Sequence, residues 1–299
     1  MSLVATLICN PANPALDSTV VDGALAVLPS PGAARWLFHE VAVDIPFTGS
    51  EEVRGIESRL REARGDLPFD IVVQPEATRR KKLFLADMDS TMIGQECIDE
   101  LADYAGFKER VAAITEGAMR GEIAFAPALR ERVALLKGLP IATIEKVIAE
   151  RIRPNPGATT LVQTMRANGA YTCVVTGGFT AFMAPLAAAI GFDEYHANKL
   201  LTDANGRLTG EVAEPVLGRE AKRDTLLTLR RRLRLGREDT LAVGDGANDI
   251  PMIEAAGLGV AFHGKPALRE AAGACIDHGD LTALLYAQGY RREDFVGAE

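Results

Sequence analysis

The chain has 299 residues, 47% of them hydrophobic, and a formal net charge of −8. This length supplies enough apolar side chains for one large domain or two smaller ones. The negative charge argues against general nucleic-acid binding, because phosphate backbones require a basic surface. No apolar stretch is long enough to cross a bilayer, and Asn10 and Pro11 interrupt any signal-peptide pattern, so we expect a cytoplasmic protein.

The cysteines and histidines show no pattern typical of cross-links or metal sites. The four cysteines lack Cys-x-x-Cys spacing, and we expect reduced thiols, as in cytosolic proteins. The four histidines do not cluster in the sequence, which argues against a zinc site.

The first 78 residues predict a small module in which strands and helices alternate. The apolar runs at 3–9 and 69–73 predict strands, and the partly alternating segment 36–45 predicts a strand or a hairpin. Helices are expected at 19–27 and 51–63, the second with one apolar face. The module contains no dedicated ligand motif. Residues 75–82 are interpreted as a linker, in which the basic run 79–82 faces solvent.

The segment that follows the linker joins a buried strand to a pair of carboxylates. Residues 83–86 form an unbroken apolar run, which suits a strand buried on both faces of a parallel sheet. Asp87 and Asp89 follow, with Ser90 and Thr91 next. Ligands of open α/β sheets bind at the carboxyl ends of strands. There, one carboxylate can attack an electrophile, the other can transfer a proton, and both can hold a hard cation. The alternative is a loop with helix-capping side chains.

The next stretch, 94–154, interrupts the α/β pattern with predicted helices at 96–104, 107–117, 125–136 and 141–152. A helical insert directly after such a strand can act as a lid. The α/β pattern then resumes. Helices are predicted at 159–167, 181–190 and 219–233, strands at 171–175, 240–243, 258–262 and 274–277, and a hairpin at 200–211 around Asn205 and Gly206.

Three further motifs follow in order along these elements. Thr176 to Phe179 (Thr-Gly-Gly-Phe) closes the strand at 171–175, Lys222 lies in the helix at 219–233, and Gly244 to Asp249 (Gly-Asp-Gly-Ala-Asn-Asp) follows the strand at 240–243. With the Asp-Met-Asp-Ser-Thr motif that starts at Asp87, this ordered set resembles the haloacid-dehalogenase-like phosphatases. Within this group, the particular residues of the motifs resemble those of the phosphoserine phosphatase family. The resemblance covers roughly residues 83–288.

The resemblance implies an α/β fold with two domains. Residues 79–299 would form a Rossmann-like parallel sheet with a helical cap at about 94–154. Residues 1–78 would form a small α+β, ferredoxin-like domain similar to the degenerate ACT-like domain of some bacterial phosphoserine phosphatases. A regulatory role and a plain interaction or stabilising role for this domain both stay open.

The resemblance also implies roles for the strand-end residues. Asp87 would be the nucleophile that forms an aspartyl-phosphate, and Asp89 the general acid and base. The cofactor would be Mg²⁺, held by Asp87, the backbone carbonyl of Asp89, and Asp245. Asp249 is interpreted as a residue behind these ligands or as the partner of Lys222.

Further residues would contact the phosphoryl group. Thr176 offers a hydroxyl and Gly177 an N–H group, while Lys222 supplies a positive charge. Related sequences often carry Ser where this chain has Thr176, and both keep the hydroxyl. Asn248 is expected to hydrogen-bond the phosphate or a metal-bound water, or else to cap a helix.

Substrate choice is expected to depend on the cap. Glu96 matches the position that contacts a substrate ammonium, and Arg132 the one that binds a carboxylate, for which a planar guanidinium is suited. Met119 and Phe125 match apolar residues that close over the site. Arg130, only two positions from Arg132, is the alternative for the carboxylate contact.

The function implied by this family is hydrolysis of O-phospho-L-serine to L-serine and phosphate, the final step of serine biosynthesis. One alternative is a related phosphatase or phosphotransferase acting on another small phosphomonoester. A second is a non-catalytic amino-acid-binding regulator. A P-type ion pump shares the aspartyl-phosphate chemistry but requires membrane helices. The expected partner is the small molecule phosphoserine, with no nucleic acid and no membrane, and a homodimer is left open.

Overall fold

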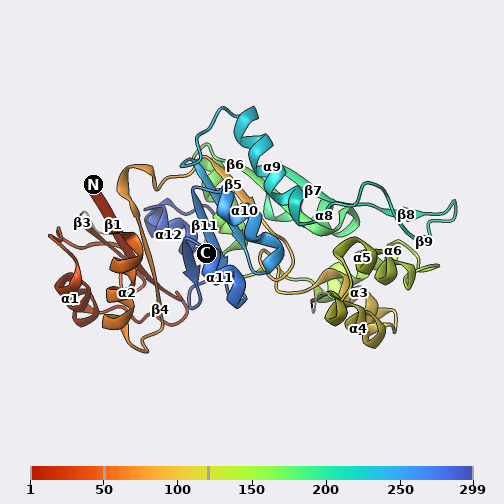
Figure 1. Ribbon diagram of the computed structural model, residues 1–299, viewed down its shortest axis with the longest axis horizontal. Helices are drawn as coiled ribbons and strands as arrows, with labels where there is room; N and C mark the ends of the chain where they lie inside the picture. Colours follow the sequence, from red (N-terminus) through yellow and green to blue (C-terminus); the bar gives the residue numbers. More distant parts are fainter. Residues whose placement is uncertain (1, 50–51, 120–121, 298–299) are drawn as a thin grey trace.

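The structure is a computed structural model that describes residues 2–49, 52–119 and 122–297. A four-stranded antiparallel sheet lies at one end of the molecule, a six-stranded parallel sheet lies in the middle, and a group of cap helices lies at the other end (Figure 1). Among the described residues, no helix combines the length and the apolar character needed to cross a membrane.

The first sheet has the strand order β2-β3-β1-β4. Its elements are β1 (Ser2–Cys9), α1 (Ser18–Val27), β2 (Arg35–Phe38), β3 (Ala42–Thr48), α2 (Val53–Arg64) and β4 (Phe69–Pro75). The side chain of Asp17 caps α1 by accepting a hydrogen bond from the Val20 N–H. The segment predicted as a strand or hairpin is a hairpin, in which Glu40 has a φ of 59°. This arrangement confirms the predicted ferredoxin-like α+β unit.

The second sheet has the order β12-β11-β10-β5-β6-β7, with all neighbouring strands parallel. Leu83 and Leu85 of β5 (Leu83–Ala86) pack on one face with α9 (Arg219–Arg232) and α10 (Ile250–Ala255). Phe84 and Ala86 pack on the other face with α7 (Ala158–Ala167) and α12 (Ala283–Ala287). All four β5 side chains are fully buried, which confirms the predicted parallel α/β sheet. The other elements are β6 (Tyr171–Phe179), α8 (Thr180–Ile190), β7 (Glu194–Asn198), β10 (Thr240–Gly244), β11 (Leu258–Phe262), α11 (Pro266–Ala271) and β12 (Ala274–Ile276).

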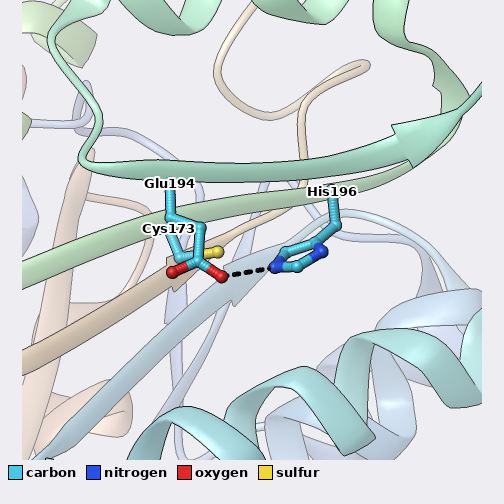
Figure 2. A group of neighbouring side chains, drawn as sticks. All are labelled: Cys173, Glu194 and His196. Carbon is cyan, nitrogen blue, oxygen red and sulfur yellow. Dashed lines mark hydrogen bonds and ion pairs between the residues drawn. The ribbon is translucent and has the colours of Figure 1, made fainter.

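Strand β7 at the sheet edge was not expected from the sequence, because its side chains are mainly polar. Figure 2 shows Glu194 and His196 on β7 beside Cys173 on β6, with Glu194 and His196 joined. The Glu194 carboxylate accepts hydrogen bonds from the Tyr171 hydroxyl at 2.7 Å and from Arg232 of α9 at 2.5 Å. Polar contacts with β6 and α9 therefore hold β7 at the edge of the sheet, although its sequence lacks the apolar pattern that predicts a strand.

The cap consists of α3 (Cys97–Tyr104), α4 (Lys108–Met119), α5 (Phe125–Ala134) and α6 (Ala142–Arg151). The predicted hairpin is formed by β8 (Leu200–Thr202) and β9 (Leu208–Val212), with Gly206 at a φ of 71° in its turn. It binds the turn between α5 and α6, because Gly138 donates to the Leu208 carbonyl and Leu208 donates to the Leu139 carbonyl, both at 2.8 Å. The hairpin therefore ties the cap to the sheet domain from which it projects (Figure 1).

The prediction that the basic run 79–82 faces solvent is wrong for two of its members. Arg79 forms an ion pair with the buried Asp44 at 2.6 Å. The ammonium of Lys81 donates to the carbonyls of Thr78 and Glu238, at 2.8 Å each, and burial lowers its pKa to about 8. These side chains reach across the junction between the two sheets, so the segment is packed.

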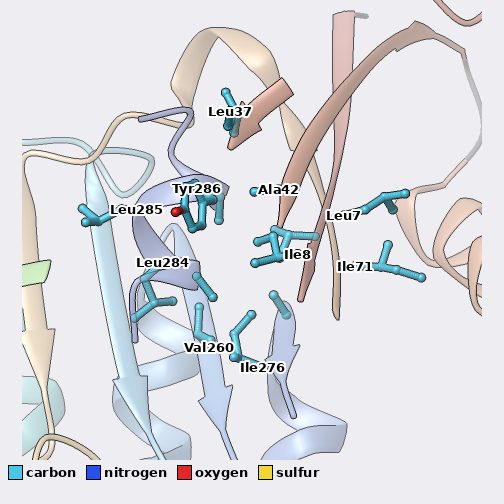
Figure 3. Close-up of a cluster of buried hydrophobic side chains, with 14 of the residues drawn as sticks. Leu7, Ile8, Leu37, Ala42, Ile71, Val260, Ile276, Leu284, Leu285 and Tyr286 are labelled. Carbon is cyan, nitrogen blue, oxygen red and sulfur yellow. The ribbon is translucent and has the colours of Figure 1, made fainter. Parts of the chain in front are cut away.

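The two sheets share one hydrophobic core across this junction. Figure 3 shows Ile8 of β1 facing Leu284 and Tyr286 of α12, with Ile276 of β12 nearby, while Leu7 points to the opposite side of the antiparallel sheet. Polar contacts reinforce the seam. The buried carboxylate of Asp70 accepts hydrogen bonds from the backbone N–H groups of residues 277–279, at 2.8 to 3.2 Å.

Replacing Asp70 by Asn should therefore destabilise the whole chain. The amide keeps the shape but turns an N–H₂ group toward backbone donors, which costs about 1–3 kcal/mol for buried groups left unpaired. Urea unfolding followed by circular dichroism measures this free energy. Asp66→Asn, at an exposed position four residues earlier, is the matched control. Equal stability of the two variants would contradict the role of Asp70 at the seam.

Candidate active site

A cavity of about 520 Å³ lies between the carboxyl edge of the parallel sheet and the cap. Its floor comes from the ends of β5, β6 and β10, and its roof from α3, α4 and α5. The residues that line it are Asp87, Asp89, Glu96, Ile98, Thr115, Phe125, Leu129, Arg132, Thr176, Gly177, Gly178, Phe179, Asp245, Gly246, Ala247, Asn248 and Lys265.

The carboxylates of β5 are presented by a tight turn. The Asp87 N–H extends the sheet ladder to the Val243 carbonyl at 3.0 Å, and its carboxylate accepts from the Met88 N–H at 2.7 Å. Ser90 has a φ of 55°, in the left-handed region that non-glycine residues rarely adopt. This turn brings Asp89 back over the strand end, so both carboxylates face the cavity.

A buried ion-pair network lies directly beneath the cavity. The Lys222 ammonium is 2.8 Å from one oxygen of Asp87 and 2.6 Å from one oxygen of Asp249. Burial alone would lower the pKa of Lys222, but the charges of Asp249 and Asp87 raise it above its usual value. Burial, and next the charge of Asp249, raise the pKa of Asp87. Lys222 does not line the cavity, so its charge acts from behind Asp87.

Asp249 also fixes the loop that carries Asp245. Its second oxygen accepts hydrogen bonds from the N–H groups of Asp245 and Gly246, each at 3.1 Å. Asp245 faces the cavity, where it lies 3.3 Å from the Lys265 ammonium and 3.4 Å from the Thr91 hydroxyl. Neither Lys265 nor Thr91 was predicted as a site residue.

The acidic residues at the strand ends form a group suited to a hard cation. Oxygens of Asp87, Asp245 and Asp249 all lie within 4.8 Å of one another, and all three residues are buried. Asp87 and Asp245 line the cavity, whereas Asp249 lies behind them with its two oxygens bound to Lys222 and to backbone N–H groups. Carboxylate oxygens are the donors that divalent hard cations prefer.

Cys173, Glu194 and His196 form a second group within the same distance limit (Figure 2). Its carboxylate is already engaged by Tyr171, His196 and Arg232. Burial raises the pKa of the Cys173 thiol, so the thiolate that a metal requires is disfavoured. Arg232 neutralises the Glu194 carboxylate, and Tyr171 and His196 bind it as well. We therefore interpret this group as a structural network.

Asp89 lines the cavity and accepts a hydrogen bond from the Cys97 N–H at 3.3 Å. Burial, and next the nearby charge of Glu96, raise the pKa of Asp89 to about 7. Glu96 accepts a hydrogen bond from the Ser90 hydroxyl at 2.7 Å. A carboxyl group that titrates near neutral pH is suited both to give and to take a proton.

The last part of β6, where its pairing with β7 is irregular between Val175 and Phe179, closes the other side of the floor. The Thr176 side-chain oxygen accepts a hydrogen bond from the Gly178 N–H at 2.9 Å. A Cβ atom on Gly177 would lie 2.9 Å from the tip of the Phe125 ring, so a glycine is required for the ring to rest on this loop. Phe125 begins α5 and is the apolar cap residue nearest to the floor at this point.

The cap brings Glu96 and Arg132 to the same cavity. Arg132 donates to the Ala128 carbonyl and to the Thr115 hydroxyl, both at 3.3 Å. Arg130, the alternative from the sequence, does not line the cavity and forms an exposed ion pair with Glu214 at 2.6 Å. Thr115 was not predicted.

Two other predicted residues differ in what the structure describes. Asn248 is exposed and lines the cavity at the short 3₁₀ helix η2 (Ala247–Asp249). Met119 is the last residue of α4, and its side chain lies outside the described part of the chain.

Comparisons with known proteins agree with this arrangement. Residues 84–254 match the haloacid dehalogenase-like hydrolase family. A phosphoserine phosphatase from Archaeoglobus fulgidus is 41% identical over 247 residues, which cover 82% of this chain and 70% of that protein.

Two solved structures cover different extents of the fold. A haloacid dehalogenase family hydrolase from Salmonella enterica serovar Typhi has a TM-score of 0.85 at 28% identity, covering 96% of this chain and 98% of that chain. A phosphoserine phosphatase solved as a phospho-aspartyl intermediate analogue has a TM-score of 0.64 at 43% identity, covering 71% of this chain and all of that one. The ordered motifs, the parallel sheet and these similarities place the chain in the haloacid dehalogenase-like hydrolase family.

Proposed function

We propose that this protein is a Mg²⁺-dependent phosphoserine phosphatase that hydrolyses O-phospho-L-serine to L-serine and phosphate, the final step of serine biosynthesis. The observation that carries the proposal is one cavity with Asp87, Asp89 and Asp245 in its floor and Glu96 and Arg132 in its roof. The floor suits phosphoryl transfer, and the roof offers one charge of each sign to a zwitterion. The similarity to proteins named phosphoserine phosphatase supports the same conclusion.

The reaction begins with attack of the Asp87 carboxylate on phosphorus. The bond from phosphorus to the serine oxygen breaks, and Asp89 gives its proton to that oxygen. In the second half, Asp89 takes a proton from a water molecule, which attacks the aspartyl-phosphate and releases phosphate. The pKa of Asp89 near 7 is suited to both directions of proton transfer. Thr176 and Gly177 stabilise the charge on the phosphoryl oxygens as it develops.

The residues present fit a divalent cation in the floor. Asp87, the backbone carbonyl of Asp89 and Asp245 would hold Mg²⁺, with Asp249 behind them. The bound cation would neutralise phosphate charge, which otherwise repels the attacking carboxylate. Lys222 keeps Asp87 oriented and supplies a further positive charge beneath it.

Selection of phosphoserine would come from the cap. The Arg132 guanidinium binds the substrate carboxylate, Glu96 binds the ammonium, and Phe125 closes over them. Asn248 contacts the phosphate from the opposite rim. Within this proposal, residues 1–78 form an ACT-like domain, residues 79–299 the hydrolase domain, and residues 94–154 its cap. A cytoplasmic location and a homodimer remain predictions.

Removal of the nucleophile should abolish turnover. Asp87→Asn keeps the shape but cannot form the acyl phosphate efficiently, so kcat should fall by on the order of 10³-fold or more. Phosphate release from phosphoserine measures this. Near-wild-type turnover by this variant would assign the nucleophile to another residue.

Chelation should also abolish activity. EDTA should remove phosphatase activity, and added Mg²⁺ should restore it, because the floor otherwise carries uncompensated carboxylates around the phosphate. The same assay with Ca²⁺ in place of Mg²⁺ tests the choice of ion. Full activity in metal-free buffer would show that no cation is required.

The cap residues predict a selective loss. Arg132→Ala should lower kcat/KM on phosphoserine by roughly 10²- to 10⁴-fold, because a buried charged contact to the substrate carboxylate is lost. Hydrolysis of p-nitrophenyl phosphate, which has no carboxylate, should change little. Arg130→Ala is the matched control, since its guanidinium binds Glu214 outside the cavity. An equal loss on both substrates would show that Arg132 serves the phosphate or the fold of the cap.

A further inference from the structure

Asn198, the last residue of β7, has a buried side chain that joins two segments of the site. It is 2% exposed, and its amide nitrogen donates to the Gly177 carbonyl at 2.8 Å and to the Leu217 carbonyl at 3.1 Å. Its amide oxygen accepts from the Leu217 N–H at 2.7 Å. One segment is the irregular end of β6, which carries Thr176 and Gly177, and the other is the loop that leads into α9. One buried amide therefore holds together two segments about forty residues apart.

The contact with Gly177 fixes a peptide plane next to the cavity. The peptide between Gly177 and Gly178 has its carbonyl held by Asn198 and its N–H held by the Thr176 side-chain oxygen at 2.9 Å. A flexible pair of glycines is thus anchored at both ends of that plane. Because the Thr176 oxygen accepts this hydrogen bond, its hydroxyl proton is available to donate into the cavity.

The contacts with Leu217 act on the other loop. Both backbone groups of Leu217 bind the Asn198 amide, and the next residue, Gly218, is the N-cap of α9. Lys222 lies in the first turn of α9 and reaches Asp87 from there. The Phe125 ring packs over both segments, since a Cβ atom on Gly177 or Gly218 would lie 2.9 or 3.5 Å from it.

We propose that Asn198 is a positioning residue for phosphoryl transfer. It does not line the cavity, and it acts by setting Gly177 and Thr176 on one side and the start of the Lys222 helix on the other. This inference rests on the proposed phosphatase function. In this inference, Asn198 positions the residues that bind phosphate and does not position those that select serine.

Gln288 is another buried amide in this chain, and its contacts point to a purely structural role. Gln288 is fully buried, accepts from the Lys81 N–H at 3.1 Å and donates to the Leu284 carbonyl at 2.9 Å. It also joins two backbone segments, but at the seam between the sheets and away from the cavity. Gln288→Glu is therefore the matched control for Asn198→Asp.

The test compares Asn198→Asp, Gln288→Glu and the wild type in kcat, in the inhibition constant of inorganic phosphate, and in thermal unfolding. Asp keeps the shape and the acceptor for Leu217 but removes both donors and turns a carboxylate oxygen toward two carbonyls. We expect kcat to fall on both phosphoserine and p-nitrophenyl phosphate by similar factors, up to on the order of 10²-fold, as small misplacements of reacting groups do. The phosphate inhibition constant should rise as well. Gln288→Glu should lower only the unfolding temperature.

Two outcomes would overturn the inference. One is an Asn198→Asp enzyme that loses stability but keeps wild-type kcat and phosphate inhibition, as the control does. The other is a loss confined to phosphoserine, which would place Asn198 with the serine-selecting residues. If Asn198→Asp fails to fold, Asn198→Ser, which adds no charge, is measured in its place with the same criteria. A wild type that hydrolyses neither substrate would refute the phosphatase function, and calorimetric binding of inorganic phosphate to the same variants would still decide the role of Asn198.

Discussion

The rest of the site depends on the two buried ion pairs that the Lys222 ammonium forms with Asp87 and Asp249. The three side chains come from β5, α9 and the loop after β10, so one buried cation joins elements that are distant in the chain. Without it, two carboxylates would remain buried and unpaired, which costs far more than an exposed ion pair contributes. Asp249 also fixes the position of Asp245, because its second oxygen accepts hydrogen bonds from the backbone N–H groups of Asp245 and Gly246.

The floor and the roof of the cavity are built by different means. The floor is held by buried hydrogen bonds and strand ends, which keep charged groups in place before substrate arrives. The roof is a helical unit that shares a buried hydrophobic cluster with the sheet domain, in which Leu129 and Val133 of α5 group with Phe179 and Phe182, and it is also tied back by the β8–β9 hairpin. In the proposed function, chemistry and selection therefore lie on different elements of one packed structure.

Much of the floor could be predicted from the sequence because its signals are local. The buried run of β5 and the carboxylates directly after it are adjacent in the chain, and the same holds for Asp245 after β10. Asn198 and Lys265 could not be predicted in this way, because their partners lie far away in sequence and a single Asn or Lys has no distinctive spacing. The polar β7 was missed for a related reason: its partners belong to α9 and β6.

The packing of the junction between the sheets also could not be predicted from local sequence. Arg79 and Lys81 look like solvated residues in a basic run, and only the folded chain brings Asp44 and the Glu238 carbonyl to them. The predicted boundary therefore falls in a segment whose sequence is typical of a linker but in which Arg79 and Lys81 are packed, while Arg80 and Lys82 are exposed.

The continuous core across that junction limits how the molecule can be divided. A chain cut before β5 would leave Ile276, Leu284 and Tyr286 in water, together with the open edge of β12 that the antiparallel sheet now covers. Uncovered apolar edges of this kind promote self-association. A shortened enzyme would thus need a redesigned polar surface on β12 and α12.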